Sequence, residues 1–326
     1  MEYPKKHLSF DQQVDRLREH GLAIADERHA RALLASVGYY RLSAYIYPFR
    51  ETLDSISPTT GQNERGKVRP GVTIEHVEEI WKFDRFMRQL VLTASETIEV
   101  GLRTQIAYVL GRRDRFGHVN REALDPEACS RMLSIRGEEI EAYEVWMERY
   151  EKLKKDAQYE DYVKHNETKY HASPLAVWVA TEFLDFGAAV RLLGLLKIED
   201  SNEIAKAMGM STGKKLHTLV LACSDARNTA AHHNRLWNRT PRKRLPKLHT
   251  REVSSELQHW DEVDHGSVYG LLTAMAYLVK RISPDDRWPI HLRERVQKFP
   301  KVPYLTAENS MGFAPGWSDL ELWRHS

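Results

Sequence analysis

The feature that most constrains the fold is an uninterrupted helical pattern that begins at Thr73 and continues to about Leu110. Apolar residues recur along it at helical spacing, at Val77, Trp81, Val91, Leu92, Leu102, Ile106 and Val109. Polar residues share this stripe when residues are placed 100° apart, namely Asp84, Arg88, Ser95 and Glu99. They either form an internal ion-pair cluster that fixes the register of the helix, or Glu99 or Asp84 helps to hold a functional site.

Helical patterns also cover most of the remaining chain, and no sustained polar–apolar alternation indicates strands. Further helices are predicted at 8–20, where Ser9 and Gln12 form a capping box, and at 26–37, 139–155, 173–196 and 266–282. Residues 51–71 and the segment around His165 are typical of polar loops. We therefore predict an all-α fold. A helical bundle over 73–282, with an irregular insertion near 111–138, joins an N-terminal helical region over 1–50 to a C-terminal tail over 283–326 packed on the bundle.

Composition and charge limit the classes of function that are possible. The chain has 326 residues, 42% of them apolar, which suffices for one large or two modest domains. Its 48 basic and 46 acidic residues nearly cancel, so any surface for nucleic acid is local. Cys129 and Cys223 lack the spacing of metal ligands and suit a reducing cytoplasm. Because we find no signal peptide and no apolar run long enough for a membrane span, we expect a soluble cytoplasmic protein without membrane contacts.

The residues that could carry chemistry gather at the end of another apolar helical pattern, in the segment 223–239, CSDARNTAAHHNRLWNR. Arg227 lies at the centre of the core-facing stripe made by Leu216, Leu219, Val220, Cys223, Ala226 and Ala230. A guanidinium that faces the core is costly unless it is paired or hydrated, so Arg227 is expected to line a polar pocket. Glu182 lies at the centre of the apolar face of the helix predicted at 173–196. We expect Glu182, in preference to Glu99, to pair with Arg227.

Two histidines follow Arg227, and helix geometry separates their roles only in part. His232 lies about 140° from Arg227 around an unbroken helix, whereas Asn228 shares a face with His232 and could orient its imidazole. His232 therefore reaches the Arg227 pocket only if the helix ends or bends there, or if a second copy of the chain completes the site. His233 remains the alternative imidazole.

A basic segment without acids follows the histidines. From Arg227 through Arg251 there are eight Lys or Arg residues and no Asp or Glu. Such a run is usually a solvated face, but this one adjoins the candidate site and contains Trp237. It predicts contacts with RNA phosphates from Arg235, Arg239, Arg242, Lys243, Arg244 and Lys247.

The motifs that are missing also narrow the chemistry. The sequence contains no Gly-rich phosphate loop, no HExxH pair, no paired CxxC and no GxSxG elbow. What remains is chemistry that a histidine and an arginine can perform without a metal. RNA would suit such chemistry because it carries its own nucleophile in the 2′-OH. No metal or cofactor is expected. A metal site made from His232, His233, His249 and Cys223 is an alternative whose spacing matches no common site.

The pattern Arg227-Asn228-x₃-His232 resembles the Arg-x₄₋₆-His signature of HEPN-superfamily ribonucleases. The longer string RNTAAHHNRLWNR resembles the Abi-like family of the AbiD/AbiF type, in which RN, AHH and RLWN occur together. Further resembling pieces extend nearly end to end, at Gly38–Ser43, Phe83-Asp84-Arg85 with Arg88, Ile98-Glu99 with Arg103, Trp178 with Glu182, Phe186-Gly187, and Met311-Gly312-Phe313 with Trp317. The tail departs from the family at Ala314, where a proline would directly follow the phenylalanine.

This resemblance implies a HEPN-like bundle and a metal-independent endoribonuclease with Arg227 and His232 as the catalytic pair. The expected products carry a cyclic or 3′ phosphate and a 5′-OH. The resemblance also implies a toxin-type abortive-infection role in phage defence, a homodimer that brings two motifs together, and, in some relatives, restraint by a structured non-coding RNA. A non-catalytic RNA-binding or assembly protein on the same bundle is the alternative function.

Overall fold

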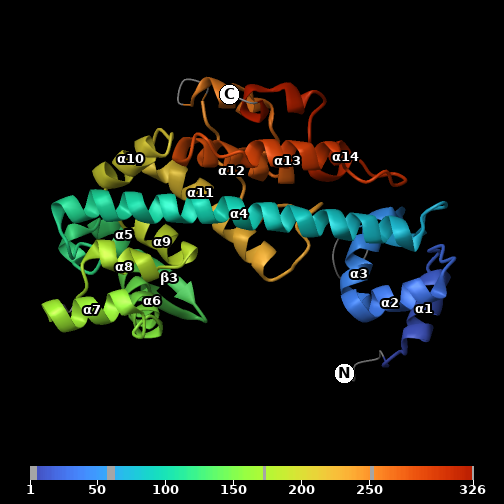
Figure 1. The fold of residues 1–326 in the computed structure, drawn as a ribbon, viewed down its shortest axis with the longest axis horizontal. Coiled ribbons are helices and arrows are strands. Elements are labelled where there is room, and N and C mark those ends of the chain that lie inside the picture. The colour runs from blue at the N-terminus through green and yellow to red at the C-terminus, as the bar shows by residue number, and fades with distance from the viewer. Residues whose placement is uncertain (1–5, 57–62, 172–173, 250–252, 325–326) are drawn as a thin grey trace.

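The computed structural model describes residues 6–56, 63–171, 174–249 and 253–324. The chain is mainly helical with two small two-stranded sheets, which confirms the predicted all-α class. Helix α4 (Ile74–Arg113) runs through the middle of the molecule, and the other elements lie around it (Figure 1). It begins where the sequence predicts, because the Thr73 side chain accepts from the His76 backbone N–H while the His76 ring accepts from the Thr73 N–H.

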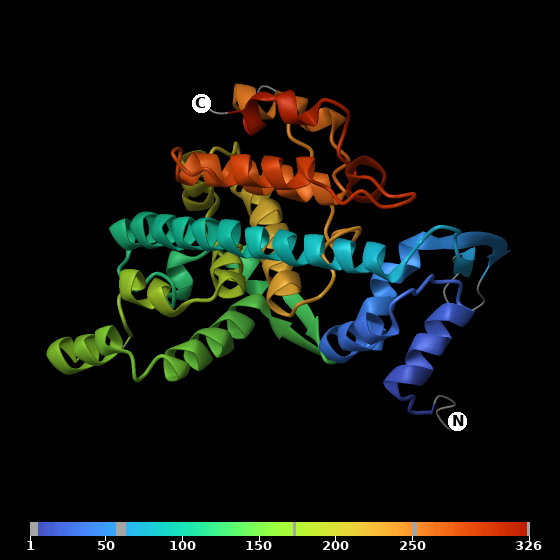
Figure 2. The ribbon, with the colours of Figure 1, turned by 45° about the vertical axis from the view of Figure 1, so that its right-hand side comes forward.

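Helix α4 is buried along most of its length because other helices pack on both of its sides. Helices α3 (Tyr39–Ile46), α8 (Val177–Phe183) and α10 (Ile198–Ala207) contact it, α11 (Gly213–Ala231) crosses it, and α12 (Val268–Ile282) runs alongside. After a turn of the view, α12 still lies on one side of α4 and the helices between 142 and 193 on the other (Figure 2). One hydrophobic cluster extends from the first helix to the tail.

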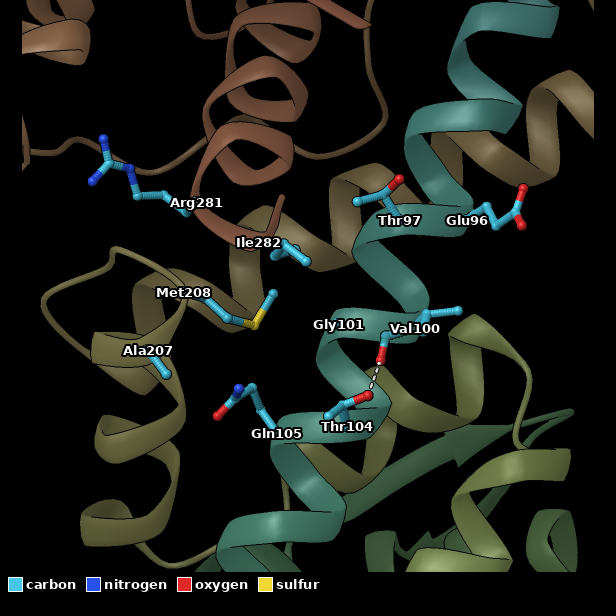
Figure 3. Close-up of a pocket in the computed structure, with 10 residues that line it drawn as sticks. All are labelled: Glu96, Thr97, Val100, Gly101, Thr104, Gln105, Ala207, Met208, Arg281 and Ile282. Carbon is cyan, nitrogen blue, oxygen red and sulfur yellow. Dashed lines mark hydrogen bonds between the residues drawn. The ribbon is translucent and has the colours of Figure 1, made fainter. Parts of the chain in front are cut away.

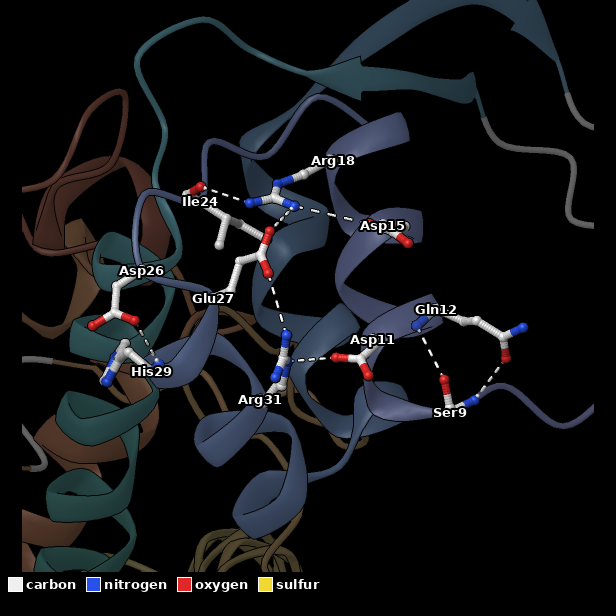
Figure 4. Close-up of polar contacts among 10 residues, drawn as sticks. All are labelled: Ser9, Asp11, Gln12, Asp15, Arg18, Ile24, Asp26, Glu27, His29 and Arg31. Carbon is white, nitrogen blue, oxygen red and sulfur yellow. Dashed lines mark hydrogen bonds and ion pairs between the residues drawn. The ribbon is translucent and has the colours of Figure 1, made fainter.

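The N-terminal region consists of α1 (Phe10–Glu19), α2 (Glu27–Val37) and α3, followed by the short helix η1 (Tyr47–Phe49). The capping box of Ser9 and Gln12 is present as predicted. Ion pairs connect α1 to α2: Arg18 contacts Glu27 at 2.7 Å, and Arg31 contacts both Glu27 and Asp11 (Figure 4). These side chains are exposed, so the pairs contribute orientation more than stability.

Two hairpins were not predicted from the sequence. Strands β1 (Arg50–Ile56) and β2 (Asn63–Val68) pair antiparallel within the segment that the sequence assigns to a loop. Strands β3 (Met132–Ile135) and β4 (Glu138–Glu141) pair antiparallel around Arg136 and Gly137, which both have positive φ. Nearly every residue of β1 is exposed, so no buried face produces the alternation that identifies a strand.

The region between α4 and α11 differs from the prediction in two ways. The helix expected over 173–196 is two helices, α8 and α9 (Phe186–Leu193), because Leu184 is extended and Asp185 caps α9 through the Ala188 N–H at 2.8 Å. The loop expected around His165 is helix α7 (Asp161–Tyr170). Ser173, the first residue of the helix predicted over 173–196, lies outside the described residues. The other elements are η2 (Arg121–Ala123), α5 (Pro126–Ser130) and α6 (Ala142–Asp156).

Three tryptophans of the C-terminal region are buried in the core. Trp288, Trp317 and Trp323 are buried, and the Trp288 indole N–H donates to the Leu90 carbonyl of α4 at 2.7 Å. The elements here are η4 (Ser255–Glu262), α13 (Trp288–Gln297), α14 (Ala307–Met311), η5 (Trp317–Asp319) and η6 (Glu321–Trp323). Within the described ranges, no helix combines the length and the apolar character needed to cross a membrane.

A buried histidine makes the stability of this fold sensitive to acid. His118 is fully buried against the ring of Tyr150, with the ring centroids 5.0 Å apart, and neither ring nitrogen has a hydrogen-bond partner in the described part of the chain. Burial lowers the pKa of His118 from 6.5 to about 4. The unfolded chain therefore takes up this proton at a higher pH than the folded chain. Stability that is intact above pH 6.5 is lost as the pH falls toward 4.

We expect the free energy of unfolding to decrease by about 3 kcal/mol from this residue alone between pH 7 and pH 4. Urea unfolding at a series of pH values measures it. Because burial also lowers the pKa of His217 and of His259, the variant His118→Phe should retain part of the acid sensitivity and lose the share due to His118. An identical pH dependence in the wild type and the variant would contradict the assignment.

Candidate functional site

Helix α11 ends at the two histidines with a defined cap. His232 is the C-cap residue, and His233 adopts the left-handed conformation with φ 56°. The His233 N–H donates to the Ala230 carbonyl and the Asn234 N–H to the Thr229 carbonyl, both at 3.0 Å, which is a Schellman arrangement. The helix therefore ends where it must if His232 is to approach the Arg227 pocket within one chain.

Arg227 is held by groups on two helices. One guanidinium nitrogen lies 3.8 Å from a carboxylate oxygen of Glu99 on α4, and the other donates to the Asn228 side-chain oxygen at 2.9 Å. Its side chain remains 27% exposed, so the guanidinium lines the surface rather than the core centre. Burial raises the pKa of Glu99, and the neighbouring cations Arg103 and Arg227 oppose that rise.

Arg103 extends this cluster to the break between α8 and α9. Its guanidinium lies 3.7 Å from Glu99 and donates to the carbonyls of Leu184 at 2.9 Å and Glu182 at 3.2 Å. These carbonyls lie at the end of α8, where the helix leaves such groups without internal partners. The row Arg227–Glu99–Arg103 thus connects α11, α4 and the end of α8. Sequence reasoning missed the role of Arg103, although its i,i+4 spacing from Glu99 was a usable signal.

The predicted pairing of Glu182 with Arg227 is wrong, and Glu99 is the partner. Glu182 is exposed, and its side chain lines a surface cavity beside Trp178, which is 52% exposed. The buried residues of α8 are Val177, Val179, Ala180 and Thr181. The prediction assumed one continuous helix over 173–196, whereas the break at Leu184 and Asp185 changes which face of each half points to the core.

The structure brings Asn228 to Arg227 and leaves both imidazoles at the surface. Asn228, His232 and His233 are exposed. We predicted that Asn228 orients the His232 imidazole. In the structure the Asn228 side-chain oxygen instead accepts a hydrogen bond from Arg227 and so positions the guanidinium. Among the residues that the structure describes, the His232 ring contacts no hydrogen-bond partner. His233 has a structural role as the left-handed cap of α11.

The loop after the histidines is fixed to α4 by Asp84. This buried carboxylate accepts from the backbone N–H groups of Trp237 at 2.6 Å and Leu236 at 3.1 Å, from the Tyr45 hydroxyl at 2.6 Å, and from the Arg88 guanidinium. Burial raises the pKa of Asp84, while Arg88 and the other donors oppose the rise. The stripe position of Asp84 predicted either an ion-pair cluster or support of a site. The structure contains the ion pair and joins it to the candidate loop.

Arg235 and Trp237 are used for this attachment. The half-buried Arg235 guanidinium donates to the Ala44 carbonyl of α3, and burial lowers the pKa of Arg235. The buried Trp237 indole donates to the Ser310 hydroxyl at 3.1 Å. These contacts give Arg235 a structural role, in contrast to the RNA contact predicted for it, and they remove Trp237 as a surface for stacking.

The rest of the basic segment lies at the surface beside α11. Arg242, Lys243, Arg244 and Lys247 are exposed and Arg239 is half-buried, and none forms an ion pair with a carboxylate in the described part of the chain. Three of them line a cavity of about 30 Å³ together with Asp225 and Thr229 of α11. Thr229 lies less than one turn before His232, so this basic surface adjoins the exposed end of the helix.

The alternative metal site does not assemble. Cys223 is fully buried, and burial raises the pKa of its thiol, whereas His232 and His233 are at the surface. No group of three His, Cys, Asp or Glu side chains placed to hold a metal ion occurs in the ranges that the structure describes.

Comparison with known proteins gives one match. The model of a protein family described as Abi-like protein matches residues 32–238, a span that includes α4, the α8–α9 break, α11 and the loop that Asp84 holds. No curated protein and no solved structure gives a significant match.

Proposed function

Because the chain belongs to the Abi-like protein family, we propose that it is an abortive-infection effector of phage defence that cleaves RNA with a HEPN-type motif. The observation that best supports this proposal is the exposed end of α11. Arg227 is held there between Glu99 and Asn228 with part of its guanidinium in solvent, and His232 follows at the C-cap. A carboxylate and an amide fix the position of the arginine, and the guanidinium still remains accessible to a ligand.

The proposed chemistry uses these two residues and the RNA itself. The 2′-OH attacks the adjacent phosphate, the His232 imidazole serves as general base or acid, and Arg227 stabilises the negative charge of the phosphorane-like transition state. The products are a 2′,3′-cyclic or 3′ phosphate and a 5′-OH. No metal or cofactor takes part in this scheme.

A homodimer is part of the proposal. The Arg227 guanidinium and the His232 ring form no hydrogen bond with each other in one chain, and both are accessible at the same helix end. A second copy facing this surface would bring an imidazole to each guanidinium. We also propose that a structured RNA could restrain such a nuclease, by occupying the same surface.

The experiment that tests the function is incubation of the purified protein with end-labelled RNA in EDTA, beside the Arg227→Ala/His232→Ala double variant. Cleavage by the wild type alone, with 5′-OH ends, supports the proposal. RNA binding without cleavage by either protein supports instead the non-catalytic RNA-binding alternative, for which the exposed basic segment is the specific observation.

Neutralising the exposed basic segment is expected to weaken RNA binding at every sequence tested. Replacing Arg242, Lys243, Arg244 and Lys247 by glutamine removes cations that form no ion pair within the described ranges and are therefore available to RNA phosphates. The plot of log Kobs against log salt has a negative slope, and its magnitude should decrease by about 0.7 for each phosphate of single-stranded RNA that the variant no longer neutralises.

The control for a general effect of net charge replaces the exposed tail residues Lys298 and Lys301 by glutamine, which removes two cations and is compared per cation removed. This control changes the net charge but not the surface beside α11. A slope that is unchanged in the basic-segment variant, or equally reduced in the tail variant, would show that the segment is only a solvated face.

A further inference from the structure

A cavity of about 500 Å³ lies between the C-terminal half of α4 and helix α8. The residues that line it include Thr104, Tyr108, Gly111 and Arg112 of α4 and Trp178 and Glu182 of α8. Two of these residues are large aromatics that the hydrophobic core does not use: Trp178 is 52% exposed and Tyr108 is 64% exposed. Exposed aromatic rings that line a cavity, here one from each helix, are suited to stack on a planar ligand.

The Trp178 ring packs against the backbone of α4. A Cβ atom added at Gly111 would lie 3.1 Å from the Trp178 ring and 3.1 Å from the Val177 side chain, so the indole lies directly against the helix. The Arg112 guanidinium lies 5.9 Å from the centroid of the Tyr108 ring and is paired with Glu203 at 2.7 Å. The backbone of α4 therefore supports the Trp178 ring, and the Arg112 guanidinium lies beside the Tyr108 ring.

This cavity is connected to the candidate site through one side chain. The Glu182 carbonyl accepts from Arg103, which lies beside Glu99, the partner of Arg227. Along α4, Tyr108 follows Glu99 by nine residues, a rise of about 13 Å, and the two and a half turns between them place the two side chains on opposite faces of the helix. A single strand of RNA that reaches both places therefore passes from Arg227 around α4, beside Arg103 and the end of α8, to the cavity.

We propose that this cavity binds one unpaired nucleobase of the RNA substrate and prefers guanine, an inference that rests on the proposed ribonuclease function. The base stacks on Trp178 and Tyr108, as unpaired bases do on aromatic side chains. An ionised Glu182 carboxylate accepts hydrogen bonds and donates none. Guanine offers it two adjacent donors, the ring N1–H and the exocyclic amino group, whereas uracil offers one N–H between two carbonyls.

A second cavity on α4 lacks the features that suit a base. It measures about 460 Å³ and is lined by residues of α4, among them Glu96, Thr104 and Gln105, and by Arg281 and Ile282 of α12 (Figure 3). The two cavities share Thr104 and are similar in volume. Because no aromatic side chain lines the second one, it offers no stacking surface, and we assign no base to it.

The test uses the full chain carrying His232→Ala, which is expected to slow cleavage, and labelled uridine decamers that contain no other base or a single guanosine, adenosine or cytidine. We expect the guanosine decamer to bind most tightly. Trp178→Ala should weaken its binding about tenfold or more, and Trp178→Phe should restore most of it. Glu182→Gln should abolish the preference for guanosine over the other bases. Tyr159→Ala, at an exposed aromatic outside the cavity, is the control and should bind as the parent does.

Equal affinities of the parent, Trp178→Ala and Glu182→Gln proteins for all decamers would overturn the inference. So would a change of oligomeric state in Trp178→Ala without any change in base preference, which would identify the surface as a contact between copies of the chain. Cleavage by the wild type tests the nuclease independently. If the wild type cleaves RNA while these variants behave as the parent does, the base site fails and the ribonuclease stands. If the decamer results hold but no cleavage occurs, the base site stands and the ribonuclease fails.

Discussion

Replacing His232 by alanine is expected to reduce the rate of RNA cleavage by about 10²–10⁴, the contribution of one general acid or base. His232 is exposed at the C-cap of α11 and makes no side-chain hydrogen bond within the described residues, so its removal should leave the fold intact. Single-turnover cleavage of labelled RNA measures the effect. Growth inhibition on overexpression, which we expect of the wild type, should be relieved in parallel.

His233→Gly is the matched control for this experiment. His233 holds a left-handed backbone conformation, φ 56°, which glycine adopts without strain. The variant removes the second imidazole and should keep wild-type activity, with stability equal to or about 1 kcal/mol above the wild type. Alanine at this position would confuse loss of the ring with backbone strain. Full activity of His232→Ala together with loss in His233→Gly would reverse the assignment.

Local patterns in the sequence predicted the framework of this site well. The start of α4 at Thr73, the polar stripe with Asp84 and Glu99, and the end of α11 near His232 follow from caps and periodicity that neighbouring residues determine. The need of Arg227 for a carboxylate partner also followed, because a guanidinium near the core must be paired. The structure supplies that carboxylate from Glu99.

Glu182 was wrongly predicted as the partner of Arg227 because one helical periodicity was assumed over the whole of 173–196. Apolar residues flank Asp185 at Leu184 and Phe186, and the prediction carried one helical face across this position. Asp185 begins a new helix there and resets the phase, which exposes both Glu182 and Trp178. The aspartate was a usable N-cap signal within the apolar pattern.

Long-range contacts were beyond any local pattern. Arg235 bonds to Ala44 of α3, and the Trp237 ring bonds to Ser310 of the tail, partners far away in the sequence. Composition marked both residues as part of a basic segment suited to RNA. Only the three-dimensional fold shows that Arg235 and Trp237 attach the loop, while Arg242, Lys243, Arg244 and Lys247 remain available.

Asp84→Ala is expected to destabilise the protein by about 3–5 kcal/mol, because it leaves the buried Arg88 guanidinium without its counter-charge. It also removes the acceptor for the Tyr45 hydroxyl and for the backbone N–H groups of Leu236 and Trp237. Urea unfolding at neutral pH measures this loss. Glu182→Gln, a change at an exposed carboxylate, should alter stability by less than about 0.5 kcal/mol and serves as the control.

The double variant Asp84→Leu/Arg88→Met separates loss of the ion pair from loss of the loop attachment. Removing both charges avoids an unpaired buried cation, so part of the stability should return. The Leu236 and Trp237 N–H groups would still lack their acceptor, and Leu236 is only four residues after His232. Cleavage by the folded double variant should therefore stay well below that of the wild type, because the segment that follows the imidazole is no longer fixed to α4.

Wild-type stability of Asp84→Ala would show that this network does not support the fold. Wild-type cleavage by the double variant would show that it does not position the site.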